Sequence, residues 1–273
     1  MPHTDGPRRR DFLRTAGVLL TPAAVPAADA AIDRRTLVRR HNPTLRRPDS
    51  RSPLSVGNGE FAFTADVTGL QSLAPLCTQS QWGWHSEPIP AGLAPSQLKL
   101  EEFDTYGRAV GYATSSGGQA PLFDWLRENP HRLNLARIGL LFENRPLDAA
   151  DLADVEQTLD LWTGVLDSRF TVRGHPVHVV TLCHPTRDAI AVTVESPALR
   201  ALAVAFDFPY GSSGITASDW DHPGRHESAL IHQGAHSAVV ARRLDDDRYF
   251  VRLHWTGDGH MSPPDRLRPL LDA

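Results

Sequence analysis

Apolar and polar side chains alternate with a period of two along most of the chain, a pattern that indicates β-strands rather than helices. The clearest short example begins at Glu60. Because successive side chains of a strand point to opposite faces, this segment is predicted to be a half-buried strand. One face would carry Phe61, Phe63, Ala65 and Val67, and the other Glu60, Ala62, Thr64 and Asp66.

A hairpin is predicted over Leu54 to Gly69, with Gly57-Asn58-Gly59 as its turn. Asn-Gly favours a type I′ turn, in which both central residues adopt positive φ. From this segment alone two interpretations stay open. The hairpin either serves the fold only, or it belongs to a site with the aromatic segment that follows it at Gln81 to His85.

The longest alternating region lies in the second half of the chain and predicts an antiparallel meander followed by further strands. So many strands with hardly any helical periodicity predict a mainly β fold, an antiparallel β-sandwich with few or no long helices. The expected strands of the meander are 155–162, 164–173, 177–184 and 189–196, and those that follow are 201–208, 228–232, 238–244 and 249–255.

The remaining segments are predicted to be shorter or irregular. Residues 31–53 are expected to be a surface lead-in that joins the sandwich only at Leu54, so the β domain is assigned to 54–256. Tyr106, Val110 and Tyr112 suggest a short edge strand, and Pro121 to Asn129 a single helical turn. Residues 257–273 contain three prolines and lose the alternation, which fits either a natural tail or an incomplete version of a longer protein.

Composition and motifs exclude some classes of partner and of chemistry. The 273-residue chain has a net charge of -4, so no global basic field attracts nucleic acid or anionic lipid. Cys77 and Cys183 are too far apart for a CxxC redox or zinc motif, and a disulfide and two free thiols both stay open. No sequence motif for a cofactor, a phosphate or a metal is present, so no cofactor and no metal site is predicted.

The N-terminus resembles a twin-arginine export signal. Arg9, Arg10, Phe12 and Leu13 fill the pattern of two arginines, any residue and Phe-Leu, and a short apolar run precedes the small residues of Ala28-Asp29-Ala30. Residues 1–30 are therefore predicted to be a signal peptide read by the twin-arginine translocase. The mature protein is expected to be periplasmic or secreted, without a membrane span, because no apolar run has the necessary length.

Three segments together resemble a known family: SVGNGEFAF, LDLWTGVLDSRFTVRGHPVHVVTLCHPTRDAIAVTVES and FDFPYGS. They are similar to the N-terminal β-supersandwich of six-hairpin glycosidases, a galactose-mutarotase-like fold, in order along roughly residues 40–255. The resemblance implies an (α/α)6 catalytic barrel after the sandwich, and this sequence ends where that barrel is still expected. No catalytic residue is therefore assigned to the chain.

Two segments carry candidate carbohydrate contacts. Trp82, Trp84 and His85 combine indole rings, which pack on sugar C–H faces, with a polar imidazole; in an extended segment both indoles would lie on one face. The alternative is core packing, since tryptophan is usually buried. The second segment is Asp219, Trp220, Asp221 and His222, for which a solvated loop is the alternative.

Other polar clusters are given structural roles. His222, His226, His232 and His236 have helical spacing but lie among glycines and strands, which disfavours a metal site. Asp245, Asp246 and Asp247 lack the spacing of a calcium loop and predict a charged turn. The sequence thus predicts the non-catalytic sandwich of a glycoside-hydrolase-like protein that supports carbohydrate processing. A standalone carbohydrate-binding or envelope-associated sandwich and an inactive truncated remnant are the alternatives.

Overall fold

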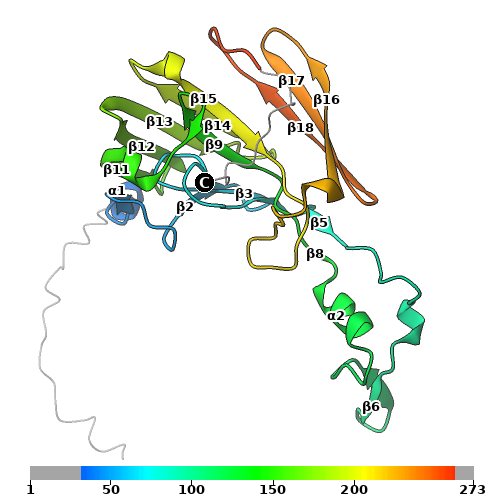
Figure 1. The fold of residues 1–273 in the computed structure, drawn as a ribbon. Coiled ribbons are helices and arrows are strands. Elements are labelled where there is room, and N and C mark those ends of the chain that lie inside the picture. Colours follow the sequence, from blue (N-terminus) through cyan, green and yellow to red (C-terminus); the bar gives the residue numbers. More distant parts are fainter. Residues whose placement is uncertain (1–31, 262–273) are drawn as a thin grey trace, which may run out of the picture. The chain divides into compact units, whose positions relative to one another are not determined.

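A computed structural model describes residues 32–261 (Figure 1), and the described chain is mainly β, with 43% strand and 12% helix. This confirms the predicted fold class. The α-helices are short: α1 spans Arg34–Arg39 and α2 spans Ala120–Glu128, where a single helical turn was predicted. All packing described below lies within the unit that begins at Arg35. The predicted signal peptide, including Arg9, Arg10, Phe12 and Leu13, lies outside the described residues.

The predicted meander forms most of a five-stranded antiparallel sheet. Its order is β1 (Thr44–Leu45), β11 (Leu152–Asp160), β12 (Val165–Val172), β13 (His175–Cys183) and β14 (Ile190–Glu195). β1 corrects the prediction that the lead-in joins the sandwich only at Leu54, because Thr44 pairs with Thr158 on β11. A two-residue strand is too short for an alternation pattern to show in the sequence.

The other strands form five smaller antiparallel sheets. Three of them have three strands: β2 (Leu54–Gly57), β3 (Phe61–Ala65) and β4 (Thr78–Ser80); β10 (Arg145–Pro146), β9 (Arg137–Phe142) and β15 (Leu202–Asp207); and β16 (His226–Gln233), β17 (Ser237–Leu244) and β18 (Asp247–His254). Two have two strands: β5 (Trp84–His85) with β8 (His131–Arg132), and β6 (Glu101–Asp104) with β7 (Ala109–Tyr112). Short 3-10 turns cover Pro95–Gln97, Ala149–Asp151, Leu199–Ala201 and Pro223–Arg225.

The opening hairpin is present as β2 and β3, but its turn differs from the predicted type I′ geometry. Only Gly59 has positive φ, at 95°. Asn58 stabilises the turn through its side chain instead: its Oδ1 accepts hydrogen bonds from the Glu60 and Phe61 amides. Its Nδ2 donates to the carbonyls of His184 and Arg187, so the same asparagine also fastens the hairpin to the β13–β14 turn.

Asp66, predicted to point outward, is buried. Its carboxylate accepts hydrogen bonds from the Thr68 amide, the Thr68 hydroxyl and the Leu73 amide, at 2.6–2.9 Å. Burial raises the pKa of this carboxyl, while the hydrogen bonds oppose that shift. A buried carboxylate that accepts several amide protons organises the turn after β3, where the strand alternation ends.

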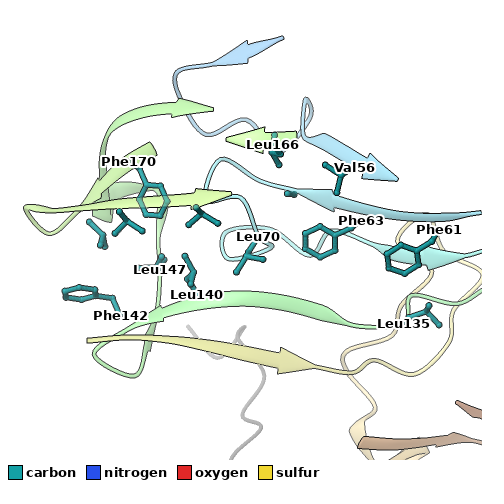
Figure 2. Close-up of a cluster of buried hydrophobic side chains, with 14 of the residues drawn as sticks. Val56, Phe61, Phe63, Leu70, Leu135, Leu140, Phe142, Leu147, Leu166 and Phe170 are labelled. Atoms are coloured by element: carbon teal, nitrogen blue, oxygen red, sulfur yellow. The ribbon is translucent and has the colours of Figure 1, made fainter. Parts of the chain in front are cut away.

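The main hydrophobic core, part of which is drawn in Figure 2, contains side chains from four sheets. Phe63 of β3 and Leu166 of β12 are fully buried, as is Leu140 of β9. The strands that supply the core contribute alternate residues, as β3 does with Phe61, Phe63 and Ala65. Other members include Val56, Phe61, Leu70, Leu135, Phe142, Phe170, Val179, Tyr210 and Tyr249.

Two arginines, Arg137 and Arg242, are buried within this framework. Arg137 donates to the carbonyls of Gln71 and Ser72, at 2.9 and 3.0 Å. Arg242 donates to the carbonyls of Glu227 and Pro209, at 2.7 and 3.0 Å, and to Nδ1 of His226 at 3.0 Å. A buried guanidinium is stable only when its donors are satisfied, so these bonds fix the segments that supply the acceptors.

Smaller predictions have mixed outcomes. Val110 and Tyr112 lie in the strand β7, whereas Tyr106 lies in the turn that precedes it, with φ of 52°. Cys77 and Cys183 are free, half-buried thiols, and burial raises the pKa of both. Among residues 32–261 no helix has the length and apolar character that crossing a bilayer requires.

The core predicts a large difference between two phenylalanines. Phe63→Ala is expected to lower the free energy of unfolding by about 3–5 kcal/mol, because it leaves a cavity at a fully buried position. Phe250→Ala, at a side chain that is 59% exposed, is the control and is expected to cost less than about 1 kcal/mol. Urea denaturation of the full chain measures both, and equal losses would contradict the assigned core.

His226 predicts a pH dependence of stability. Burial, and then the charge of Arg242, lower the pKa of His226 from 6.5 to about 4. The unfolded chain binds a proton at His226 more tightly than the folded chain does. The free energy of unfolding is therefore highest above pH 6.5, where His226 is neutral in both states, and decreases as the pH falls toward 4. The loss is at most about 3 kcal/mol.

The measurement is the unfolding free energy between pH 7.5 and pH 4 for the wild type, His226→Gln and the exposed-site control His260→Gln. Glutamine keeps an acceptor for Arg242 but cannot titrate, so its pH slope is expected to be smaller than that of the wild type. His260→Gln is expected to keep the wild-type slope. The same slope in all three proteins would refute the assignment.

Candidate functional site

The two-residue strands β5 and β8 arrange the first candidate segment. Trp84 pairs with Arg132 across this ladder, and His85 pairs with His131. Since neighbouring residues of a strand face opposite sides, Trp84 is exposed with Arg132 on one side. His85 and His131 are buried together on the other.

Trp82 is 51% exposed and is held at one edge of its ring. Its Nε1 donates to Asp188 Oδ2 at 2.6 Å, and the same oxygen accepts from the Ser80 hydroxyl at 2.6 Å. The Trp82 ring also lies 6.1 Å from that of Tyr249, centroid to centroid. The indole is therefore fixed in place while about half of it faces solvent.

Trp84 is 45% exposed and is fixed by different partners. Its Nε1 donates to the Gln81 carbonyl at 3.0 Å, and the Arg132 guanidinium lies 4.0 Å from its ring centroid. Arg132 in turn donates to the carbonyls of Ser80 and Gln81. We call Trp82, Trp84, Arg132 and Asp188 the tryptophan platform.

The extended geometry expected for residues 82–84 is not what forms. The Trp84 amide donates to the Trp82 carbonyl at 2.8 Å, so the chain turns tightly between the two rings. Gly83 suits this turn, since a Cβ there would lie 3.3 Å from the Ser80 carbonyl oxygen. Both indoles are exposed, but each is held by a separate set of contacts.

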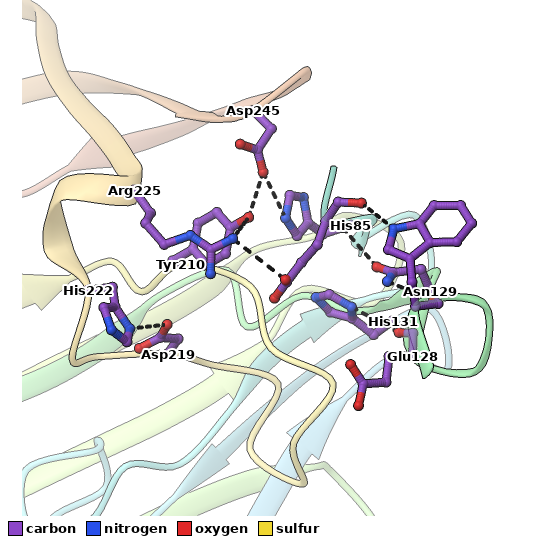
Figure 3. Close-up of polar contacts among 11 residues, drawn as sticks. His85, Glu128, Asn129, His131, Tyr210, Asp219, His222, Arg225 and Asp245 are labelled. Atoms are coloured by element: carbon purple, nitrogen blue, oxygen red, sulfur yellow. Dashed lines mark hydrogen bonds and ion pairs between the residues drawn. The ribbon is translucent and has the colours of Figure 1, made fainter. Parts of the chain in front are cut away.

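His85, predicted as a polar sugar contact, is buried at 1% exposure. Its Nδ1 lies 2.8 Å from Asp247 Oδ2 and donates to it, and its Nε2 lies 3.4 Å from Asp245 Oδ2 without hydrogen-bond geometry. Figure 3 shows the imidazole between Asp245 and His131. The acidic turn between β17 and β18, predicted to be only a charged turn, is therefore fastened to β5 through His85.

Tyr210 connects the two predicted segments. Its ring meets His85 edge-on at 5.1 Å, and its backbone pairs with Asp219 in both directions. Its hydroxyl donates to Asp245 Oδ2 at 2.6 Å and accepts from Arg225 Nη2 at 2.8 Å (Figure 3). Burial and the hydrogen bond to Asp245 raise the pKa of the phenol, so it stays a donor at neutral pH. We call His85, Tyr210, Arg225, Asp245 and Asp247 the Tyr210 cluster.

The second predicted segment has one anchored and two exposed polar side chains. Asp219 is half-buried and accepts from the Asp221 amide at 2.9 Å, while its other oxygen lies 2.8 Å from His222 Nδ1. Asp221 and His222 are exposed, and Trp220 is half-buried with Nε1 lacking a hydrogen-bond partner among the described residues. These contacts give Asp219 a structural role in holding the loop beside Tyr210.

A depression of about 500 Å³ lies beside the Tyr210 cluster. Its lining residues are Asp124, Arg127, Glu128, Pro130, His131 and Ser213. His131 Nδ1 donates to the Glu128 carbonyl at 3.1 Å, and burial lowers the pKa of this histidine. Gly211 covers the imidazoles, since a Cβ there would collide with His85 and lie 2.9 Å from His131 Nε2.

The four histidines considered for a metal are separated in the structure. His222 contacts Asp219, His226 contacts Arg242, and His236 contacts the Trp255 ring. His232 lies on β16, with Nε2 3.4 Å from the Ser237 hydroxyl. In the part of the chain that the structure describes, no three His, Cys, Asp or Glu side chains are grouped as metal ligands.

Sequence reasoning found Trp82, Trp84 and His85 but missed the residues that hold them. Arg132, Asp188, Tyr210, Arg225 and the carboxylates of the β17–β18 turn come from four other segments. The available signals were weak: an aspartate in a Pro-containing turn, and a tyrosine at the end of the FDFPYGS segment. Neither indicates which distant side chain it will contact.

No protein-family model matches this chain, and no curated protein sequence matches it significantly.

Proposed function

We propose that the chain is the non-catalytic β-sandwich of an exported, glycoside-hydrolase-like protein, and that it contacts carbohydrate at the tryptophan platform. The observation that carries this proposal is the pair of fixed, half-exposed indoles of Trp82 and Trp84. The mainly β fold and the resemblance of three sequence segments to six-hairpin glycosidases also support this proposed function.

The platform has the chemistry of a sugar-binding surface. Both indole N–H groups are already used inside the protein, by Asp188 and by the Gln81 carbonyl, so the exposed ring surface is what remains for a ligand. Sugar C–H faces pack on such rings. Because the rings are held before binding, little side-chain entropy is lost when a ligand packs on them.

The carboxylates near the platform support contact rather than hydrolysis. Glycoside hydrolysis usually requires an acid and a second carboxylate on opposite sides of one sugar. Asp188 Oδ2 accepts two hydrogen bonds that position Ser80 and Trp82, and Asp245 and Asp247 hold Tyr210 and His85. These carboxylates therefore act as structural acceptors, and hydrolysis would belong to a following (α/α)6 domain of the kind that the resemblance implies.

Trp84→Ala tests the platform. A glycan array with neutral oligosaccharides identifies the best ligand of the full chain, and calorimetric titration then gives its Kd. The variant is expected to weaken binding by about tenfold or more, because it removes the stacking surface. Trp84→Phe is expected to keep most of the affinity.

Trp162→Ala is the matched control, since Trp162 is also about half-exposed, at 48%, but lies in the β11–β12 turn. It is expected to leave Kd unchanged. Circular dichroism and thermal melting establish that all variants are folded. No glycan binding by the wild type, or an equal effect of Trp84→Ala and Trp162→Ala, would reject the proposal.

Export is tested separately with the N-terminal arginines. Changing Arg9 and Arg10 together to Lys is expected to leave the precursor in the cytoplasm of a bacterium that has the twin-arginine translocase. Arg8→Lys, just outside the matched pair, is expected to leave export intact. Immunoblots of periplasmic and cytoplasmic fractions measure the outcome, and undiminished export of the double variant would exclude this route.

A further inference from the structure

The sheet of β16, β17 and β18 has two faces of different character. On β17 the buried residues Ala238, Val240, Arg242 and Leu244 alternate with the more exposed Ser237, Val239, Ala241 and Arg243. The first set faces the protein interior. The second set, with its cross-strand neighbours, forms what we call the outer face.

A β-bulge determines which residue of β16 lies on the outer face. The register shifts between Leu230 and His232, so that Leu230 pairs with Val240 and His232 pairs with Val239. Without the bulge, Ile231 would lie opposite Val239. Bulges commonly redirect a side chain, and here the result is an imidazole beside Val239 in place of an aliphatic chain.

The neighbouring strand adds two more nitrogen donors. Val239 pairs with Arg252 of β18, and Ser237 pairs with His254. Directly opposed side chains in an antiparallel pair lie about 5 Å apart at Cβ. His232, Arg252 and His254 thus surround the shorter side chains of Val239 and Ser237, and these five residues line a hollow of about 340 Å³.

Two of the residues around this hollow, Arg252 and His254, keep their donors free within the described chain, whereas His232 Nε2 lies 3.4 Å from the Ser237 hydroxyl. Arg243, on the same face, is paired with Glu227 at 2.6 Å. By contrast, among residues 32–261 no hydrogen bond or ion pair engages the side chain of Arg252 or His254. The lining contains no carboxylate. An unpaired guanidinium, with five N–H donors in a planar arrangement, favours a bidentate carboxylate or a similar anion.

An exposed aromatic ring lies next to Arg252 along β18. Phe250 is two residues before Arg252 on β18, on the same face, and is 59% exposed. Residues i and i+2 of a strand lie about 7 Å apart, which is close to the width of a sugar ring with its substituents. We propose that the outer face of the β16–β18 sheet binds the carboxylate of an acidic saccharide at Arg252, with the sugar ring on Phe250. This site is separate from the tryptophan platform and does not depend on it.

The test is a titration of the full chain with trigalacturonic acid, followed by amide NMR shifts and by calorimetry. The amides of Ser237, Val239, Arg252 and His254 are expected to shift saturably. Arg252→Gln is expected to raise Kd by about tenfold or more through loss of the bidentate contact. Phe250→Ala is expected to raise Kd for the trisaccharide while leaving the weaker shifts caused by acetate unchanged.

Arg243→Gln is the matched control, because this arginine lies on the same face but is already paired with Glu227. It is expected to leave Kd within about twofold. Maltotriose, which has no carboxylate, is expected to cause no shifts at the outer face. Equal Kd values for the wild type and Arg252→Gln would overturn the proposal. Inorganic phosphate binding as tightly as trigalacturonic acid would overturn the assignment to a saccharide.

Discussion

The buried guanidinium of Arg242 is the interaction on which the arrangement around the site depends. A charged group without water must have its donors satisfied, and Arg242 finds acceptors in the carbonyls of Glu227 and Pro209. These acceptors belong to β16 and to the segment that leads into Tyr210, so one side chain of β17 joins them. Tyr249, beside Arg242, donates its hydroxyl proton to the Leu135 carbonyl at 2.6 Å and connects the sheet to the chain before β9. The β16–β18 sheet is therefore attached to its neighbours by polar contacts inside an apolar environment.

The tryptophan platform is held in place through the same sheet. Trp82 packs against Tyr249, and the residue after Trp84 is His85, which is fastened to the β17–β18 turn through Asp247. A buried imidazole next to an exposed indole is a natural consequence of strand alternation, because one side of β5 must face inward. His85 is therefore a positioning residue on the buried side of β5. The sequence analysis had instead predicted that its imidazole contacts a ligand.

The sequence predicted the strands well and their contacts poorly, for a physical reason. Period-two alternation reports whether one face of a segment is buried, which is enough to place the meander and the strands β15 to β18. It does not report which segments meet: His85 and Asp247 are 162 residues apart, and Trp82 and Asp188 are 106 apart. Alternation also gives no information about a turn that is stabilised by a side chain, as the opening turn is by Asn58. It misassigns a polar residue that is buried with its hydrogen bonds satisfied, as Asp66 is. The candidate residues were therefore visible in the sequence, while their roles depended on long-range partners.

Arg242 and Arg252 differ in whether their guanidinium donors are used within the protein. Both carry the same guanidinium, and they lie on adjacent strands, but on opposite faces. On the inner face the donors of Arg242 are consumed by carbonyls and an imidazole, so this arginine has no capacity left for a ligand. On the outer face the donors of Arg252 have no partner in the described chain, and a bulge in β16 brings His232 rather than Ile231 toward it. A stable fold requires the first arrangement, whereas nothing in the fold requires the second. The donors of Arg252, beside a hollow and an exposed ring, are therefore available to a ligand, whereas those of Arg242 are not.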